Sequence, residues 1–397
     1  MTDATTPAGG ASADPAVPVS TASALAPPLS ELTTLRVGGP ARELVQPDSE
    51  LEIVRTALDV WSTGDDWWVL GGGSNVVAPD DGLDGTVIRL ATHGVKRIEG
   101  DDPARVHLRV QAGDPWDALV GLTVYNGWSG IEALSGIPGS VGAAPIQNIG
   151  AYGQDLSQVL VAVDFLDWET GHRLRLTADE LGLGYRTSAI KRGRLGIVIA
   201  VELELTATTD RVPLSRPVAY AQLADALGVQ VGEAAPIREV REAVLRLRAG
   251  KGMVLDAADP DSVSAGSFFT NPIVEESVAR ALPADLPRWP IEPDDDTPLV
   301  LPLGYEPAPR PRDTRPRHVK LSAAWLIERA GIHRGFALPG SHAAISSKHT
   351  LALTNRGGAT ALEIEQLAEF VRTRVASEFG VVLAPEPVFL GPSDDLY

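Results

Sequence analysis

The chain has 397 residues, of which 44% are hydrophobic and 22% charged, and a formal net charge of −18 at pH 7. This length exceeds one ordinary core and predicts two or three domains, and the acidic balance argues against nucleic-acid or anionic-membrane partners. The absence of cysteine excludes disulfides, thiolate ligands and cysteine nucleophiles, and the seven histidines contain no HxxxH pair, so we expect no metal site.

The first 28 residues are rich in Ala, Thr, Ser and Pro and contain no Lys or Arg. They lack the basic start and apolar core of a signal peptide, so we expect a disordered tail at 1–28. No run of 18 apolar residues follows it, which predicts no membrane span, and we expect a cytoplasmic protein.

The segment from residue 49 to residue 127 predicts helices and short strands. A Ser cap, early acidic residues and apolar spacing of three and four indicate a helix at 49–63. Residues 67–77 predict a strand that runs into GGGSN, but the spacing is not GxGxxG and a turn follows where a Rossmann helix would be required. Alternation and flanking Pro and Gly then predict strands at 86–90 and 106–113 and a helix at 115–127.

A glycine-rich stretch at 131–153, IEALSGIPGSVGAAPIQNIGAYG, is the most distinctive part of the sequence. Few of its side chains are bulky or charged, and glycine lets another group approach the backbone closely. Glycine-rich runs are often plain loops, but this one alternates glycine with Ile, Val and Ala. We interpret it as a buried loop that offers backbone N–H groups and the amides of Gln147 and Asn148 to a flat or phosphorylated ligand.

Strands dominate the region that surrounds this stretch. Two alternating segments around the turn at 169–171 predict a hairpin over 159–181, and a further strand is predicted at 195–206. Residues 67–206 therefore indicate an α+β unit with a ligand at its loops.

The second half of the chain contains more helices and two irregular segments. A glycine-rich loop is predicted at 251–272, and the proline-rich stretch at 283–317 predicts an irregular surface excursion. The other elements predicted here are helices at 217–228, 236–250 (ended by a Gly), 320–331 and 359–380, and strands at 342–355 and 381–391.

Three polar residues stand in settings where chemistry is possible. Arg186 lies among Gly, Tyr and Ser in GYRTS, a small polar environment suited to a fixed guanidinium. Ser267 lies in AGSFFTNP without a GxSxG elbow or a His–Asp pair in register, which disfavours a serine hydrolase. Glu386 lies between two prolines ahead of Val-Phe-Leu, which favours an inward carboxyl, although a lone Glu in a bend is usually exposed.

Taken together, six motifs resemble the UDP-N-acetylenolpyruvoylglucosamine reductase (MurB) family, whose members make UDP-N-acetylmuramate for peptidoglycan. They cover about residues 33–391 and follow the order found in that family. The motifs are LGGGSN (70–75), SGIPGSVGAAPIQNIGAYG (135–153), GYRTS (184–188), AGSFFTNP (265–272), KLSAAWLIERAG (320–331) and PEPVFLG (385–391).

The resemblance implies an α+β protein with an N-terminal FAD-binding region of the vanillyl-alcohol-oxidase (PCMH) type and a C-terminal α+β substrate domain. FAD would be bound non-covalently, NADPH would reduce it, and UDP-N-acetylglucosamine enolpyruvate would then enter the same cleft. We expect a monomer without a nucleic-acid or membrane partner. The implied division is a tail at 1–28, an FAD-binding region of two α+β subdomains at 29–209, a substrate-binding domain at 210–385 and a C-terminal strand at 386–397 that returns to the active site.

The resemblance also assigns individual residues. The catalytic trio would be Arg186, Ser267 and Glu386. The residues that would face the substrate are Tyr185, Tyr220, Arg248, Lys251 and Asn271. The residues that would hold FAD are Gly71, Gly72, Gly73, Ser74, Asn75, Ile137, Pro138, Gly139, Val141, Gly142, Ala143, Gln147, Asn148, Gly150, Ala151 and Tyr152.

The implied reaction explains these residue types. Hydride addition to the terminal carbon of the enolpyruvyl group leaves negative charge on the neighbouring carbon and its carboxylate, and fixed donors in a dry site stabilise such charge best. Arg186 can clamp the carboxylate, and Glu386 beside it must be protonated or share a proton. Ser267 would deliver the proton to the carbon, and the surrounding charge must make that proton easier to lose.

Two other functions remain open on the sequence. One is a flavin oxidase that uses oxygen; many such enzymes attach flavin through a His near the glycine loop, where Ser74 and Asn75 stand here. The other is a flavin or sugar-nucleotide sensor without turnover, which would have no need of a proton donor such as Ser267. The sequence also leaves the choice between NADPH and NADH open.

Overall fold

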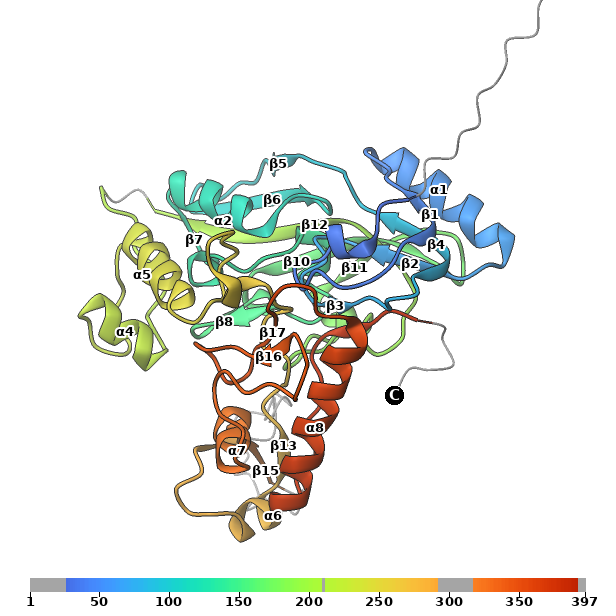
Figure 1. Cartoon of the computed structure of the whole chain (residues 1–397). Helices are drawn as coiled ribbons and strands as arrows, with labels where there is room; N and C mark the ends of the chain where they lie inside the picture. The colour runs from blue at the N-terminus through green and yellow to red at the C-terminus, as the bar shows by residue number, and fades with distance from the viewer. Residues whose placement is uncertain (1–25, 209–210, 292–316, 392–397) are drawn as a thin grey trace, which may run out of the picture.

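The computed structural model describes residues 26–208, 211–291 and 317–391. Figure 1 shows an upper body built on β-sheets, from which a smaller lobe that carries the long helix α8 (Ala361–Phe379) projects downward. Most of the predicted tail at 1–28 lies outside the described residues. Within its last three residues, Pro28 forms a β-bridge with Pro40, so the described fold begins before residue 29.

A small parallel sheet lies at one end of the upper body. Its strand order is β1 (Ala41–Val45), β4 (Leu83–Arg89) and β2 (Trp67–Leu70). Helix α1 (Glu50–Thr63) covers it, begins at a Ser49 side-chain cap and ends at a left-handed Gly64, as the sequence predicts. Its buried Ile53, Ala57 and Val60 pack against both this sheet and the larger one, so α1 joins the two sheets.

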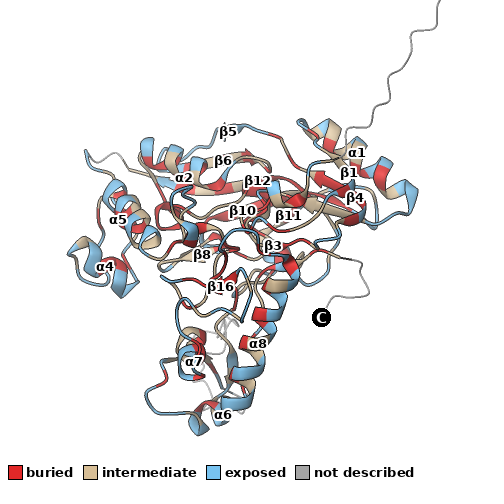
Figure 2. Ribbon diagram, in the orientation of Figure 1, coloured by how far each residue is buried: buried red, intermediate tan, exposed pale blue. Residues whose placement is uncertain are grey.

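The larger sheet is antiparallel and forms the centre of the upper body. Its strand order is β11 (Arg173–Thr177), β10 (Leu160–Asp167), β12 (Gly196–Ala207), β6 (Arg105–Gln111) and β5 (Val95–Ile98), with β7 (Trp128–Ser129) also paired to β12. The predicted hairpin of β10 and β11 is present, although residues 178–181 form the short helix α3 (Ala178–Leu181). Buried residues line these strands and the facing side of α2 (Trp116–Tyr125) (Figure 2).

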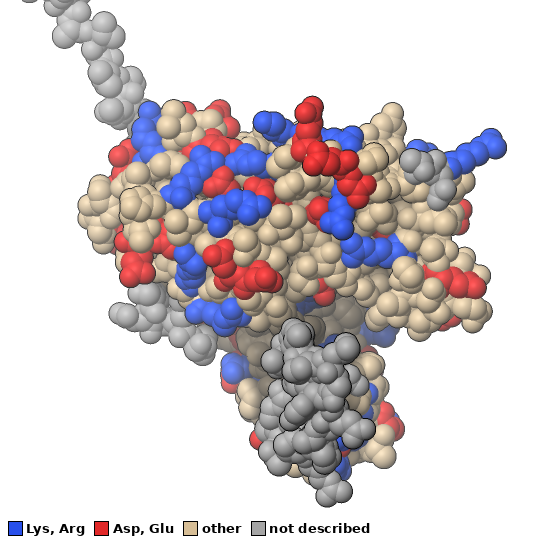
Figure 3. All heavy atoms as spheres, turned by 180° about the vertical axis from the view of Figure 1, so that it is seen from behind, with Lys and Arg blue, Asp and Glu red and all other residues tan. Residues whose placement is uncertain are grey.

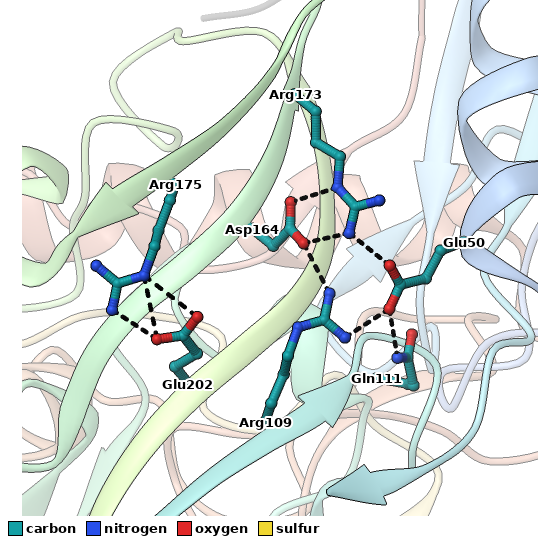
Figure 4. A network of polar contacts seen from close by, with 7 residues as sticks. All are labelled: Glu50, Arg109, Gln111, Asp164, Arg173, Arg175 and Glu202. Carbon is teal, nitrogen blue, oxygen red and sulfur yellow. Dashed lines mark hydrogen bonds and ion pairs between the residues drawn. The ribbon is translucent and has the colours of Figure 1, made fainter. Parts of the chain in front are cut away.

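An ion-pair network covers part of this sheet next to α1 (Figure 4). Arg109 of β6 and Arg173 of β11 each contact both Asp164 of β10 and Glu50 at the start of α1, and the Arg109–Asp164 contact is 2.7 Å long. Although burial pushes the pKa of Glu50 upward, hydrogen bonds from Arg109, Gln111 and Arg173 hold it at about 2. The network therefore links α1 to three strands of the sheet.

Helices α4 (Ala221–Leu227) and α5 (Ile237–Ala249) also belong to the upper body by their packing. Val240 and Val244 of α5 form one cluster with Leu223 of α4 and with Ala133 of the glycine-rich stretch. The sequence assigned both helices to the 210–385 domain; in the structure they pack on each other and contact Ala133 and Tyr152 of the first half of the chain. Gly250 after α5 keeps a helical φ of −60°, and Gly252 takes the left-handed conformation instead.

The lower lobe is a second α+β layer, and its core cluster also contains Leu35, Val37 and Val77 of the first half of the chain. A three-stranded sheet, β13 (Ile273–Glu275), β15 (His318–Leu321) and β14 (Arg288–Ile291), lies with α6 (Glu276–Ala281), α7 (Ala323–Arg329), the hairpin β16 (Ala343–Ile345)–β17 (Leu353–Asn355) and α8. Thr360 and Glu363 form a capping box at the start of α8. The core of the lower lobe contains Phe268 and Phe269 together with Leu326, Leu367 and Val371.

Several predicted elements of this lobe need correction. The helix predicted from residue 320 begins at Ala323, because His318–Leu321 pair on both sides as a strand. In the proline-rich stretch, residues 292–316 lie outside the described residues, and Arg288–Ile291 are a regular strand. Residues 342–355, predicted as one strand, contain the hairpin β16–β17. Of the final strand predicted at 381–391, only β18 (Val388–Phe389) forms.

On the face seen in Figure 3, basic and acidic side chains interleave over the upper body. Across the described ranges, no helix combines the length and the apolar character needed to cross a bilayer. Within those same ranges, no three His, Asp or Glu residues gather as potential metal ligands.

Candidate active site

Two glycine loops meet directly at the centre of the site. The first, residues 71–75, leaves β2 and leads into β3 (Val76–Val77); the second is residues 136–140. A Cβ added to Gly72 would lie 2.6 Å from the Cα of Gly139, so only glycine permits this approach. Ser74 Oγ donates to the Pro138 carbonyl at 3.0 Å, and Asn75 Nδ2 donates to Gln147 Oε1 at 2.9 Å, which holds the loops in register.

Several hydrogen-bond donors of these two loops have no acceptor within the described residues. Among the described residues, the backbone N–H groups of residues 71–75, Ile137, Gly139 and Ser140 have no acceptor. The hydroxyl of Ser140 is buried and also lacks a partner. A run of N–H groups with a hydroxyl and no nearby side-chain bulk is suited to phosphate oxygens, and buried donors of this kind require an acceptor. The cradle therefore fits a pyrophosphate-bearing cofactor.

Not every residue expected to hold the cofactor offers a free donor. Val141 N–H donates to the Asp114 carbonyl and Gly142 N–H to the Ala112 carbonyl, each at 2.8 Å. A Cβ on Gly142 would lie 2.5 Å from the Cβ of Ala112, so this glycine is required for packing against the end of β6. Ala143 and the hairpin β8 (Gly150–Ala151)–β9 (Gln154–Asp155) continue the wall of the site.

Glu386 connects this cradle to the lower lobe. Its N–H donates to the Phe268 carbonyl at 2.9 Å, and its carbonyl accepts from Asn75 Nδ2 and from Lys191 Nζ, each at 3.2 Å. Two residues later Val388 donates to the Asn75 carbonyl, and β18 runs parallel to β3. The two prolines and these backbone bonds fix the position of Glu386 beside the loop that carries Ser267.

Arg186 faces the Glu386 carboxyl. Its Nε lies 3.3 Å from Glu386 Oε1, and its Nη2 donates to the Gly150 carbonyl at 2.7 Å. Arg186 has a φ of 54°, and Asn148 and Tyr152 beside it also have positive φ values of 46° and 50°. Such non-glycine conformations cost about 1 kcal/mol or more each and concentrate at functional sites.

Burial shifts the protonation of Glu386. Only 12% of the Glu386 side chain is exposed, and burial raises the pKa of its carboxyl although Arg186 and Lys191 act in the opposite direction. Burial likewise lowers the pKa of the Lys191 ammonium. The carboxyl is thus closer to its neutral form than an exposed glutamate.

Ser267 has a partner that the sequence did not reveal. Its Oγ lies 3.4 Å from Nε2 of His349, which belongs to the turn between β16 and β17. Burial, followed by the charges of Lys251, Arg334 and Arg248, lowers the pKa of His349 to about 4, so the ring is neutral at pH 7.

Two further groups of residues flank the trio. On one side, Tyr152 and Tyr220 meet edge to face with ring centroids 5.6 Å apart, and Lys251 Nζ lies 5.6 Å from the Tyr152 ring. Nearby, Arg248 donates to the Met253 carbonyl while its buried Nε has no partner. On the other side, the ring of Tyr185 lies 5.0 Å from the ammonium of Lys320, and Asn271 Oδ1 accepts from Ala323 N–H at the start of α7.

The structure therefore brings most of the predicted site residues together. Arg186 and Glu386 are in direct contact, and Ser267 precedes the residue that binds the Glu386 backbone. Sequence reasoning missed His349, Lys191 and Ser140. Lys191 stands five residues after Arg186, so it could have been found from that spacing; His349 lies 82 residues after Ser267 and carries no local signal.

A phosphate cradle joined to a part-buried Arg–Glu pair and a serine fits a flavin-dependent oxidoreductase. Two family models agree with this assignment. Residues 41–177 match an FAD binding domain, and residues 259–390 match the UDP-N-acetylenolpyruvoylglucosamine reductase C-terminal domain.

Comparison with known proteins identifies the family. The chain is 62% identical to the UDP-N-acetylenolpyruvoylglucosamine reductase of Leifsonia xyli subsp. xyli, over 92% of this chain and 98% of that protein. It is 47% identical to the enzyme of Thermobifida fusca, over 92% and 97% of the two chains. The crystal structure of the Thermus caldophilus MurB matches with a TM-score of 0.58 at 26% identity, covering 91% of this chain and 97% of that one. The chain belongs to the UDP-N-acetylenolpyruvoylglucosamine reductase (MurB) family.

These matches confirm the family resemblance, the fold class with its FAD-binding region, and the prediction of an FAD-binding reductase of peptidoglycan precursor synthesis.

Proposed function

We propose that this protein reduces the enolpyruvyl group of UDP-N-acetylglucosamine enolpyruvate to the lactyl ether of UDP-N-acetylmuramate, with NADPH as the hydride donor. Its relatives are named as reductases of the enolpyruvyl sugar. FAD, when bound, supplies the chemistry of accepting a hydride and passing it on. The glycine cradle fits its pyrophosphate, and residues 71–75, Ile137, Gly139 and Ser140 would hold it.

The observation that carries the proposal is the Arg186–Glu386 pair beside the Ser267 loop. In this function Arg186 binds the substrate carboxylate and stabilises the charge that develops there. Glu386, with its raised pKa, donates a hydrogen bond to the same carboxylate as a neutral acid. Ser267 gives its proton to the carbon next to the carboxylate.

Arg248 and Lys251 would bind the anionic part of the sugar nucleotide. Within the described part of the chain, neither forms an ion pair with a carboxylate: Lys251 donates to Gln222 Oε1 at 3.0 Å and Arg248 to a carbonyl. Two cations without an acidic partner suit a diphosphate. Tyr220 lies at the rim on Tyr152 with 46% of its surface exposed, so its ring could cover the nucleotide. We propose that Tyr185 and Asn271 line the opposite side.

The experiment uses the visible spectrum of the purified protein. We expect a flavin spectrum that NADPH bleaches and that the enolpyruvyl sugar nucleotide restores without oxygen. Ser267→Ala should leave bleaching unchanged and slow restoration by roughly 10²–10⁴-fold, because only the second half-reaction needs that proton. A colourless protein, or equal slowing of both half-reactions, contradicts the proposal. Rapid restoration by oxygen alone would instead favour an oxidase.

A further inference from the structure

His349 is held against Ser267 by the backbone of both segments. The Phe268 N–H donates to the Leu351 carbonyl at 2.7 Å, which ties the serine loop to the turn at 346–352. The His349 N–H donates to Ser346 Oγ at 3.2 Å. The imidazole is partly buried, and its Nε2 lies 3.4 Å from Ser267 Oγ. The Ser–His contact is therefore built into the junction of two loops.

A serine next to a histidine often forms a nucleophile–base pair, and the charges around this pair argue against that role. In a nucleophile–base pair, a carboxylate behind the imidazole makes the ring a better base. The charges that act most strongly on His349 come instead from Lys251, Arg334 and Arg248, all of them cations. A neutral ring among cations is a poor base for a serine proton, so the pair does not serve as the nucleophile of a hydrolase.

A neutral imidazole next to a hydroxyl can either accept its proton or donate to its oxygen. If Nε2 accepted, the Ser267 proton would point at the ring and away from any substrate. If Nε2–H donates, the hydroxyl proton is free to point into the cleft, and the oxygen keeps a donor as negative charge develops on it.

We propose that His349 is a positioning residue for Ser267: Nε2–H donates to Oγ and so aims the serine proton at the substrate carbon. This inference rests on the proposed function, in which Ser267 supplies that proton. As the new C–H bond forms, the Ser267 O–H bond breaks. The oxygen then regains a proton from water, while His349 keeps its own proton throughout.

The test measures reoxidation of the flavin by the enolpyruvyl sugar nucleotide, in holoenzyme first reduced with dithionite so that the nicotinamide donor plays no part. We expect His349→Ala to slow reoxidation by roughly ten- to hundred-fold with little change in substrate affinity. His349→Gln, whose amide N–H can reach the same oxygen, should restore most of the rate. The exposed His172 gives a matched control, and His172→Ala should behave as the unchanged protein.

A double-mutant cycle separates positioning from general damage. If His349 acts through Ser267, His349→Ala should have little further effect in protein that already carries Ser267→Ala. Full additivity, a Gln variant as slow as the Ala variant, or normal reoxidation by His349→Ala would overturn the inference. If Ser267→Ala itself reoxidises normally, the proposed function fails instead.

Discussion

The contact between the two glycine loops predicts the effect of adding one methyl group. In Gly72→Ala the new Cβ would lie 2.6 Å from Gly139 Cα and 2.9 Å from its carbonyl carbon, both of them backbone atoms that cannot rotate away. Gly72 does not have a positive φ, so alanine fits its backbone and the effect comes from crowding alone. The loops must part by most of an ångström. Overpacking of this kind costs about 1–3 kcal/mol, which would weaken FAD binding by roughly 5- to 150-fold.

The assay is a fluorescence titration of the FAD-free protein with FAD, accompanied by urea unfolding of the FAD-free form. Gly100→Ala is the matched control, because a Cβ there meets no atom within 4 Å. We expect normal FAD affinity in this control and a loss in Gly72→Ala. If Gly72→Ala binds FAD within twofold of the unchanged protein, the two loops do not hold the cofactor together and the reasoning is refuted.

Substitutions at three further residues test the rest of the site and the fold. Lys251→Ala should raise the dissociation constant of the sugar nucleotide more than it lowers the maximal rate of flavin reoxidation, and the opposite pattern would make Lys251 catalytic. Glu386→Gln should keep reoxidation within about tenfold while Glu386→Ala loses roughly 10²-fold or more, because a neutral side chain can still donate to the substrate carboxylate; equal losses would show that the negative charge is needed. For Glu50, the pKa is lowered in the fold to about 2 from an ordinary 4.5, so its stabilisation is complete above pH 4.5 and disappears as the pH falls toward 2. Allowing for solvent screening, Glu50→Gln should lower the free energy of unfolding by about 1–2 kcal/mol at pH 7, and urea unfolding at pH 3 should show a smaller difference.

Local chemistry predicted the parts of the site that depend on backbone shape. The glycines at 71–73 and at 136 and 139 are needed because chain segments touch, and such a need is visible in composition alone. Apolar periodicity likewise predicted α1 and α8, whose caps at Ser49 and Thr360 are local signals.

Contacts between distant segments were beyond the reach of the same reasoning. Lys320 and Leu321 stand directly before the apolar spacing of α7 and were predicted as its start, but strands on both sides pair with His318–Leu321 and decide their structure. Val141 and Gly142 lie in a typical ligand loop, yet their N–H groups bind Asp114 and Ala112. His349 could not be assigned to Ser267, because only the pairing of the Phe268 and Leu351 backbones places them together.

The backbone of Glu386 connects the upper body and the lower lobe, whose residues together form the site. Its N–H binds Phe268 in the lower lobe, and its carbonyl binds Asn75 of the cofactor loop and Lys191 near Arg186. A displacement of the lobe would therefore move the carboxyl, the serine loop and the cradle together rather than separate them. Because hydride and proton must reach adjacent carbons of one small group, a shared backbone anchor of this kind preserves the geometry that the reaction needs. The side chain of Glu386 supplies chemistry, and its main chain supplies the alignment.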